Sequence, residues 1–202
     1  VHCTAIPYGQ RPCCSASLES DINAYKSVYD QYEQQQQNVQ SQIDKQVEDL
    51  RRQEEANKKN DPSYDAGKDN GATGSMMWPC PSCHTITSEF GWRYHPIYHT
   101  QKYHSGVDIG ASYGASIVAA DGGTVITAGA VSGYGNCVVI NHGNGITTLY
   151  GHMSSIAVSS GQKVSKGQTI GYVGSTGNST GPHLHWEVTV NGVRQNPLNY
   201  AR

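Results

Sequence analysis

Residues 123–152 read GTVITAGAVSGYGNCVVINHGNGITTLYGH, and this stretch is decisive for the fold. β-Branched and apolar residues form short runs in it, and the glycine-rich segment His142-Gly143-Asn144-Gly145 separates two of them. Short β-branched runs that alternate with turn signals are typical of antiparallel strands joined by hairpins. Because no helix-period segment interrupts the runs, we predict an all-β antiparallel domain.

The same pattern covers the second half of the chain, and we assign the domain to residues 79–202, which is long enough for a core of its own. The strands are predicted at Ser116–Ala120, Gly123–Val131, Cys137–Asn141, Ile146–His152, Thr169–Val173 and His183–Val190. Trp78, Trp92 and Trp186 are expected to pack in the core rather than to bind substrate.

A different pattern occupies residues 18–60. Apolar residues recur there at alternating spacings of four and three, along a seam of Leu18, Ile22, Tyr25, Tyr29, Tyr32, Gln36, Val39, Ile43, Gln46 and Leu50. This heptad seam predicts one long, coiled-coil-like helix. A stripe so narrow cannot be buried by the helix alone. We expect it to pair with a second copy, another helix or the downstream domain; a solvated spacer helix is the other interpretation.

The segments that flank this helix lack periodicity. Residues 1–17 are predicted to be irregular. Asp61-Pro62 ends the helix because proline cannot continue it, and residues 61–78 are rich in Gly, Asp, Asn, Ser and Ala, which predicts a flexible linker. The chain begins at Val1 without a signal peptide, so we expect a processed product or a fragment.

Composition excludes two classes of partner. The formal net charge is −2, which gives no basic surface for nucleic acid. No run of 18 apolar residues exists, so no transmembrane segment is predicted.

Cys80 and Cys83 form a CxxC without a second ligand pair, which argues against a zinc finger. We interpret them as a local disulfide or two free thiols.

Histidines and a carboxylate occur in groups with metal-ligand spacing. In His104-Ser105-Gly106-Val107-Asp108, a turn at Gly106 would let the imidazole and the carboxylate meet one ion. In His183-Leu184-His185, the two imidazoles share one face of a strand.

A further histidine, His152, ends the predicted strand 146–152. Two histidines and one carboxylate form a three-ligand zinc site with an open position, which is the arrangement of catalytic zinc. Another histidine would then serve as general base or stabilise the oxyanion.

Residues 90–200 resemble the lysostaphin/LytM-type zinc metallopeptidases. The resemblance is carried by the segments FGWRYHP, HSGVDIGA, GGTVITAG, YGNCVVINHGNGITTLYGHM, GQKVSKGQTIGYVGSTGNSTGPHLHWEV and NPLNY. It implies that His104, Asp108 and His185 bind one zinc ion per chain. It also implies that His152 and His183 are catalytic, and that Tyr98 helps to stabilise the oxyanion.

The resemblance further implies an antiparallel β fold, a zinc endopeptidase acting on bacterial peptidoglycan peptides, in the stem or the cross-bridge, and a location outside the cytoplasm. The alternatives are a non-enzymatic regulator of a separate cell-wall amidase and a peptidase inhibited by its own helix or linker. The helix could also mediate self-association or bind a cell-wall or divisome protein. We expect structural hydrogen bonds from His142 and ordinary loop positions for His95 and His99, and we assign His84 no role.

Overall fold

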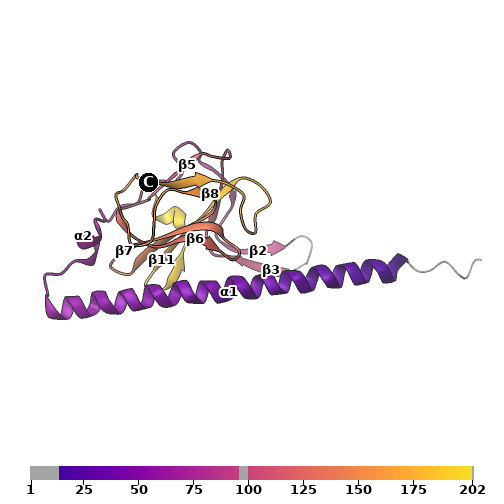
Figure 1. Cartoon of the computed structure of the whole chain (residues 1–202), viewed down its shortest axis with the longest axis horizontal. Coiled ribbons are helices and arrows are strands. Elements are labelled where there is room, and N and C mark those ends of the chain that lie inside the picture. Colours follow the sequence, from indigo (N-terminus) through magenta and orange to yellow (C-terminus); the bar gives the residue numbers. More distant parts are fainter. Residues whose placement is uncertain (1–13, 96–99, 202) are drawn as a thin grey trace, which may run out of the picture.

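The computed structural model describes residues 14–95 and 100–201. It consists of a long helix that runs along one side of a β domain and extends past the domain at its N-terminal end (Figure 1). The helices are α1 (Cys14–Asn60), α2 (Ala66–Asn70) and the 3-10 helix η1 (Pro197–Asn199). The strands are β1 (Thr85–Ser88), β2 (Gly91–His95), β3 (Thr100–His104), β4 (Val107–Gly110), β5 (Ser116–Val118), β6 (Gly123–Val131), β7 (Gly135–Gly143), β8 (Ile146–Ile156), β9 (Lys163–Val164), β10 (Thr169–Val173), β11 (His183–Val190) and β12 (Val193–Gln195).

Ten of these strands form one antiparallel sheet, whose main path runs β1-β4-β11-β8-β7-β6-β9. Strand β10 pairs with β5 and β8, and β12 pairs with β11. Strands β2 and β3 pair with each other and form a separate two-stranded ribbon. The predicted glycine-rich turn joins β7 to β8, and Gly143, Asn144 and Gly145 all have positive φ there, which explains their residue types. The predicted all-β antiparallel class is confirmed.

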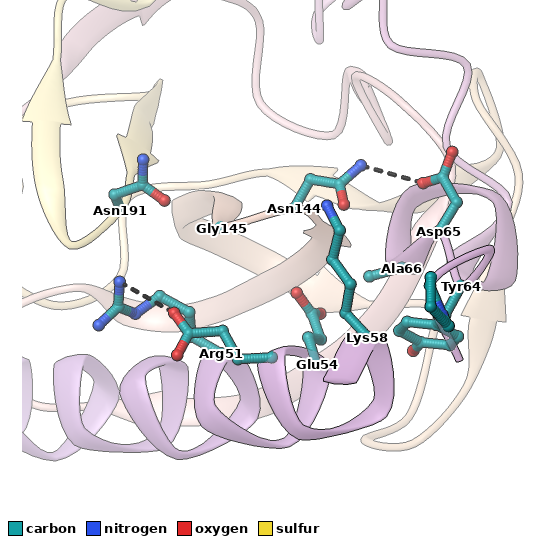
Figure 2. A pocket seen from close by; sticks show the side chains of 11 residues that line it. Arg51, Glu54, Lys58, Tyr64, Asp65, Ala66, Asn144, Gly145 and Asn191 are labelled. Carbon is teal, nitrogen blue, oxygen red and sulfur yellow. Dashed lines mark hydrogen bonds and ion pairs between the residues drawn. The ribbon is translucent and has the colours of Figure 1, made fainter. Parts of the chain in front are cut away.

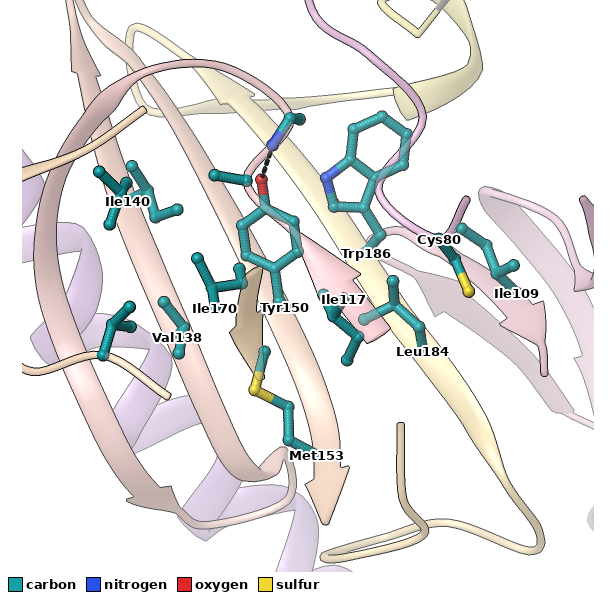
Figure 3. Close-up of a cluster of buried hydrophobic side chains, with 14 of the residues drawn as sticks. Cys80, Ile109, Ile117, Val138, Ile140, Tyr150, Met153, Ile170, Leu184 and Trp186 are labelled. Carbon is teal, nitrogen blue, oxygen red and sulfur yellow. Dashed lines mark hydrogen bonds between the residues drawn. The ribbon is translucent and has the colours of Figure 1, made fainter. Parts of the chain in front are cut away.

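The main core lies on one face of the sheet (Figure 3). Val138 and Ile140 of β7 point into it and pack in one cluster with Tyr150 and Trp186. Successive side chains of a strand point to opposite faces. Cys137 and Val139 therefore point to the other face of β7, where they belong to a second cluster that α1 covers.

Helix α1 packs on this second face. Ile43 and Val47 are buried against Cys137, Val139 and neighbouring side chains of β7 and β8. Burying two such side chains contributes roughly 1.5–3 kcal/mol each. The apolar stripe of the helix is expected to pack on a second copy, on another helix or on the downstream domain. In this structure it packs on the downstream domain.

The buried stripe of α1 differs from the predicted seam in its register. The buried residues Ile43 and Val47 are four apart, and Val39, four residues earlier, packs beside them, whereas Gln46, a predicted seam position, is exposed. A straight α-helix has ~3.6 residues per turn, so a strict heptad seam drifts off the contact line. Within the described chain, no helix is long and apolar enough to cross a membrane.

The N-terminal prediction is tested only in part. Residues 1–13 lie outside the described residues, and residues 14–17, predicted to be irregular, already belong to α1.

Residues 61–78 differ from the flexible linker that their composition predicts. The Asp65 carboxylate caps α2, which ends at Gly71 with positive φ. The backbone N–H groups of Thr73 and Gly74 donate to the Asp121 carboxylate, at 2.9 and 2.9 Å. These bonds attach the segment to the domain.

The end of α1, α2 and the β7–β8 turn enclose a polar pocket of about 490 Å³ (Figure 2). Asn144 Nδ2 donates to Asp65 Oδ1 at 3.1 Å across it. This bond ties the cap of α2 to the turn, so we interpret the pocket as a structural junction.

All six predicted strands are present, as β5, β6, β7, β8, β10 and β11, with shifts at some ends. The sequence did not predict six short strands, which are β1, β2, β3, β4, β9 and β12. Cys80, Cys83 and Cys137 are free thiols, which agrees with the free-thiol interpretation of the CxxC. Cys83 Sγ donates to the Gly110 carbonyl oxygen at 2.6 Å.

Candidate functional site

Three adjacent strands bring the predicted residues together. Strand β11 pairs with β4 so that His185 lies opposite Asp108, and with β8 so that His185 lies opposite Gly151. His152 follows Gly151 directly, and His183 lies two residues before His185 on the same face of β11.

The metal-ligand geometry is present without rearrangement. His185 Nδ1 lies 2.8 Å from Asp108 Oδ1, and His104 Nε2 lies 3.2 Å from the same oxygen. The two imidazole nitrogens are 3.2 Å apart. One ligand atom from each residue lies within 4.8 Å of the others. Two imidazoles and one carboxylate that converge in this way fit a single zinc ion.

Gly106 lies in the bend between β3 and β4, where the sequence predicts a turn, but the reason for glycine there is different. It does not adopt positive φ. A Cβ at this position would lie 2.3 Å from the Trp186 carbonyl oxygen, so glycine is required because β11 passes so closely. This approach brings the His104–Asp108 segment against the strand that carries His185.

The outer nitrogen of each ligand histidine donates to a fixed acceptor. His104 Nδ1 donates to the Glu89 carbonyl oxygen at 2.8 Å, and His185 Nε2 donates to Glu187 Oε1 at 3.0 Å. In a neutral ring, these bonds leave His104 Nε2 and His185 Nδ1 as lone-pair donors that face the site. Histidines that bind metals usually show this arrangement.

Glu187 is a buried carboxylate that the sequence analysis missed. Ser105 Oγ donates to it, Tyr134 Oη donates at 2.8 Å, and Arg194 Nε donates at 3.2 Å. A signal for it existed, because His183, His185 and Glu187 alternate along β11 and so share one face.

The electrostatics of the site favour a cation between the ligands. Burial alone would raise the pKa of Asp108, but hydrogen bonds from His104 and His185 hold it well below its usual range. Burial lowers the pKa of His185, but its bonds to Asp108 and Glu187 prevail and raise the pKa to about 9. The site therefore stabilises positive charge where a metal ion would supply it.

His152 and His183 stand beside the ligands. Their ring centroids are 4.6 Å apart, and His183 Nε2 lies 3.7 Å from Asp108 Oδ1. His152 Nδ1 donates to the Thr176 carbonyl oxygen at 2.7 Å, and His183 Nδ1 donates to that of Gly181 at 2.8 Å. In the neutral rings, each Nε2 is therefore left to accept a proton.

The backbone and the pKa of His152 are both unusual. Its φ is +61°, a conformation that costs energy for a residue with a side chain and is often found at functional sites. Burial, together with the neighbouring His185, lowers its pKa to about 4. The ring is therefore a neutral proton acceptor at pH 7.

A groove of about 770 Å³ opens over these five groups. One wall comes from α1 and contains Gln37, Gln40, Ser41 and Asp44. Other parts of the lining come from the β2–β3 ribbon and from the loop before β11, and they contain Arg93, Tyr94, Tyr103, Asn178, Ser179 and Thr180. Gln40 Oε1 lies 2.8 Å from Tyr134 Oη, so α1 contacts the Glu187 network directly.

The remaining predictions have mixed outcomes. Tyr98 and His99 lie outside the described residues. The loop position expected for His95 is wrong, because His95 ends β2 and pairs with Thr100, and its side chain lies outside the described residues. His142 makes the expected structural hydrogen bonds, to Gly122 and Thr148. Trp186 is buried in the core and Trp78 packs against it. The core placement of Trp92 is wrong, because its side chain is 70% exposed on the ribbon.

Comparisons with known proteins give consistent matches to this domain. The sequence profile of Peptidase family M23 matches residues 102–197. The DD-carboxypeptidase/endopeptidase Mpg of Neisseria meningitidis serogroup B is 47% identical over 116 residues, which is 57% of this chain and 27% of that protein. The murein hydrolase activator NlpD of Salmonella dublin is 36% identical over 124 residues, 61% of this chain and 31% of that protein.

The chain thus spans 27% and 31% of the length of these two curated relatives. A solved structure is matched over nearly its whole length. The catalytic domain of lysostaphin from Staphylococcus simulans superposes with a TM-score of 0.53 and 32% identity, covering 58% of this chain and 91% of that domain. Sequence and fold agree, and the chain belongs to Peptidase family M23.

Proposed function

We propose that this chain is a zinc-dependent endopeptidase that hydrolyses peptide bonds of bacterial peptidoglycan, in the stem peptide or the cross-bridge, outside the cytoplasm. The observation that carries the proposal is the convergence of His104, Asp108 and His185 beside two further histidines in one groove. The Neisseria relative is named as a DD-carboxypeptidase/endopeptidase, which supports cleavage of peptide bonds, and the Salmonella relative is named as a murein hydrolase activator, which supports a link to peptidoglycan.

The donor set fits one zinc ion per chain, bound by His104 Nε2, Asp108 Oδ1 and His185 Nδ1. Bound zinc would lower the pKa of a water molecule to about 7 and polarise the scissile carbonyl. The backbone carbonyl of Glu89 and the carboxylate of Glu187 would hold the imidazoles of His104 and His185 in the required tautomers.

His152 and His183 would transfer the protons. Each has its Nδ1–H bonded to a backbone carbonyl, so its Nε2 can accept the proton of the attacking water and later donate it to the leaving amine. We propose Tyr98 as a donor to the oxyanion that forms on the carbonyl carbon. The peptidase domain would comprise residues 79–202.

Site variants test the proposal on purified peptidoglycan. We expect His183→Ala to lower the cleavage rate about 10²–10⁴-fold, as for loss of a general base, while the protein retains its zinc. His104→Ala should lose both zinc and cleavage. His84→Ala is the matched control, since this ring stacks on Trp78 and does not line the groove. Wall cleavage that persists in His183→Ala or in His104→Ala would refute the proposal.

Two alternatives have a specific observation behind them. The NlpD relative is named as an activator, so the chain could instead regulate a cell-wall amidase. Direct activation of an amidase by this protein without bound zinc would favour that function.

The α1 wall of the groove motivates the other alternative, an autoinhibited peptidase. Helix α1 could equally bind a second copy or a cell-wall or divisome protein. Release of α1 from the domain should raise the cleavage rate if the helix inhibits, and should lower or preserve the rate if it does not.

A further inference from the structure

The β2–β3 ribbon exposes an unusual amount of aromatic surface. Trp92 is 70% exposed, Tyr94 60% and Tyr103 41%. An exposed apolar patch of this kind on a soluble domain usually marks a binding surface. The proposed peptidase mechanism uses none of these three rings.

Strand register places the rings on one face of the ribbon. Trp92 pairs directly opposite Tyr103, and Tyr94 is two residues beyond Trp92, so all three share a face. The Trp92 and Tyr103 rings are 5.4 Å apart, and Phe90 supports Tyr103 from the side at 5.5 Å. The ribbon therefore presents a supported aromatic surface, which we call the aromatic face, defined by Trp92, Tyr94 and Tyr103.

This face is continuous with the groove. Tyr103 directly precedes the ligand His104 in β3, and Tyr94 and Tyr103 both line the groove. A substrate whose peptide lies over His104 therefore has its adjoining part beside the ribbon.

The chemistry of the ribbon favours sugar rings as its occupant. Its sequences, GWRYH and TQKYH, contain no Leu, Ile or Val, and the exposed Gln101, which pairs with Tyr94 and shares the face of the rings, can donate hydrogen bonds beside them. A pyranose ring has an apolar C–H face that stacks on an aromatic ring and a rim of hydroxyl groups that needs polar partners. In peptidoglycan, the peptide to be cut is covalently attached to such sugars.

We propose that the aromatic face binds the glycan strand next to the peptide that occupies the groove. This inference rests on the proposed peptidoglycan substrate and adds a second subsite to it, one that recognises saccharide and not peptide. Trp92, as the most exposed ring and one that does not line the groove, is its principal contact.

Matched substrates separate this subsite from the metal site. Cross-linked peptide dimers are prepared with and without their attached disaccharides, and KM and kcat are measured with the full chain. We expect Trp92→Ala to raise KM about tenfold on the sugar-bearing dimer, the effect of losing one stacked ring, with kcat unchanged. KM on the sugar-free dimer should not change. Trp92→Phe, which keeps a ring, should restore most of the affinity.

Tyr113→Ala is the control, because this ring is 68% exposed but lies outside the ribbon and the groove. It should leave both KM values unchanged. Equal KM for wild type and Trp92→Ala on the sugar-bearing dimer would overturn the proposal. An equal rise of KM on both dimers would overturn it too, because the ribbon would then bind peptide.

A binding measurement keeps the test independent of catalysis. Peptide-free glycan strands are titrated into the wild-type protein and into Trp92→Ala by calorimetry. We expect binding that the substitution weakens about tenfold. If neither dimer is cleaved, the proposed function fails while this titration still decides the subsite. Absence of glycan binding to the wild-type protein would overturn it.

Discussion

His185 has a carboxylate on each of its ring nitrogens, Asp108 on Nδ1 and Glu187 on Nε2. Asp108 is a ligand candidate, whereas Glu187 acts only through the ring. Burial would raise the pKa of Glu187, but the hydrogen bond and charge of His185, with Arg194, lower it to about 2. The carboxylate is thus charged at neutral pH and fixes which nitrogen faces Asp108 and the proposed metal site.

Replacing this carboxylate should weaken zinc binding. Glu187→Gln keeps the side-chain shape but removes the charge that His185 and Arg194 require. We expect the zinc dissociation constant to rise about 10–100-fold, the usual effect of losing such a partner. Competition with a chromophoric chelator measures it, and Glu55→Gln on the exposed side of α1 is the control. An affinity within twofold of wild type would contradict this role.

His142 predicts a pH dependence of stability that is independent of the metal site. Its ring is buried, its Nδ1 donates to Gly122 and its Nε2 accepts from Thr148. Burial lowers its pKa below the ordinary 6.5. Below about pH 6.5 the unfolded chain therefore binds more protons than the folded one, and the free energy of unfolding falls as the pH decreases.

Urea denaturation at pH 7 and pH 5 measures this contribution. We expect His142→Asn to have a lower free energy of unfolding than wild type at pH 7. On acidification to pH 5, the free energy of unfolding of the variant should fall less than that of wild type, and the difference should be up to about 1.4 kcal/mol per pH unit. The same loss in both proteins would show that His142 does not titrate between these two values.

The residue types of the site were predictable, but their supporting partners were not. His104, Asp108, His152, His183 and His185 were identified by spacing and by family resemblance, and the structure brings them together. Tyr134 and Arg194 contact Glu187 from other elements, so no local spacing reveals them.

At the scale of elements, α1 is packed on the sheet through Ile43 and Val47 and covers Cys137. Burial raises the pKa of the Cys137 thiol to about 12, so it is unreactive while the helix is in place.

Thiol labelling therefore reports whether α1 is docked. Ile43→Asp places a charge in the apolar contact, which should release the helix and expose Cys137. Alkylation followed by peptide mass spectrometry should show Cys137 labelled at least about tenfold faster than in wild type. Gln42→Asp, at an exposed neighbouring position, should not change the rate. Unchanged labelling in Ile43→Asp would contradict docking through this contact.

Elements that have their own local signal were predictable, and those held by distant partners were not. Strands β6, β7 and β8 have β-branched runs with glycine turns between them. Residues 61–78 read as a linker because their order depends on bonds such as Thr73 to Asp121, which are 48 positions apart. Strands β1 to β4 are short, and their pairing depends on β11 and on each other.

The whole molecule combines these parts into one groove. A helix from the first third of the chain, a separate ribbon and the strands of the main sheet all line it. Sequence predicts the helix and the domain separately, but the face on which they meet depends on the two-sided burial of β7, which a run of apolar residues does not reveal. The α1 wall and the aromatic face together distinguish this groove from a bare metal site.

The most direct test of the account is mass spectrometry of purified peptidoglycan after incubation with this protein, with and without a zinc chelator. The account predicts new peptide ends that disappear with chelator and return when zinc is restored, and their masses identify the bond that is cut. New ends that persist with chelator, or none from walls of several cross-link types, would contradict a zinc endopeptidase.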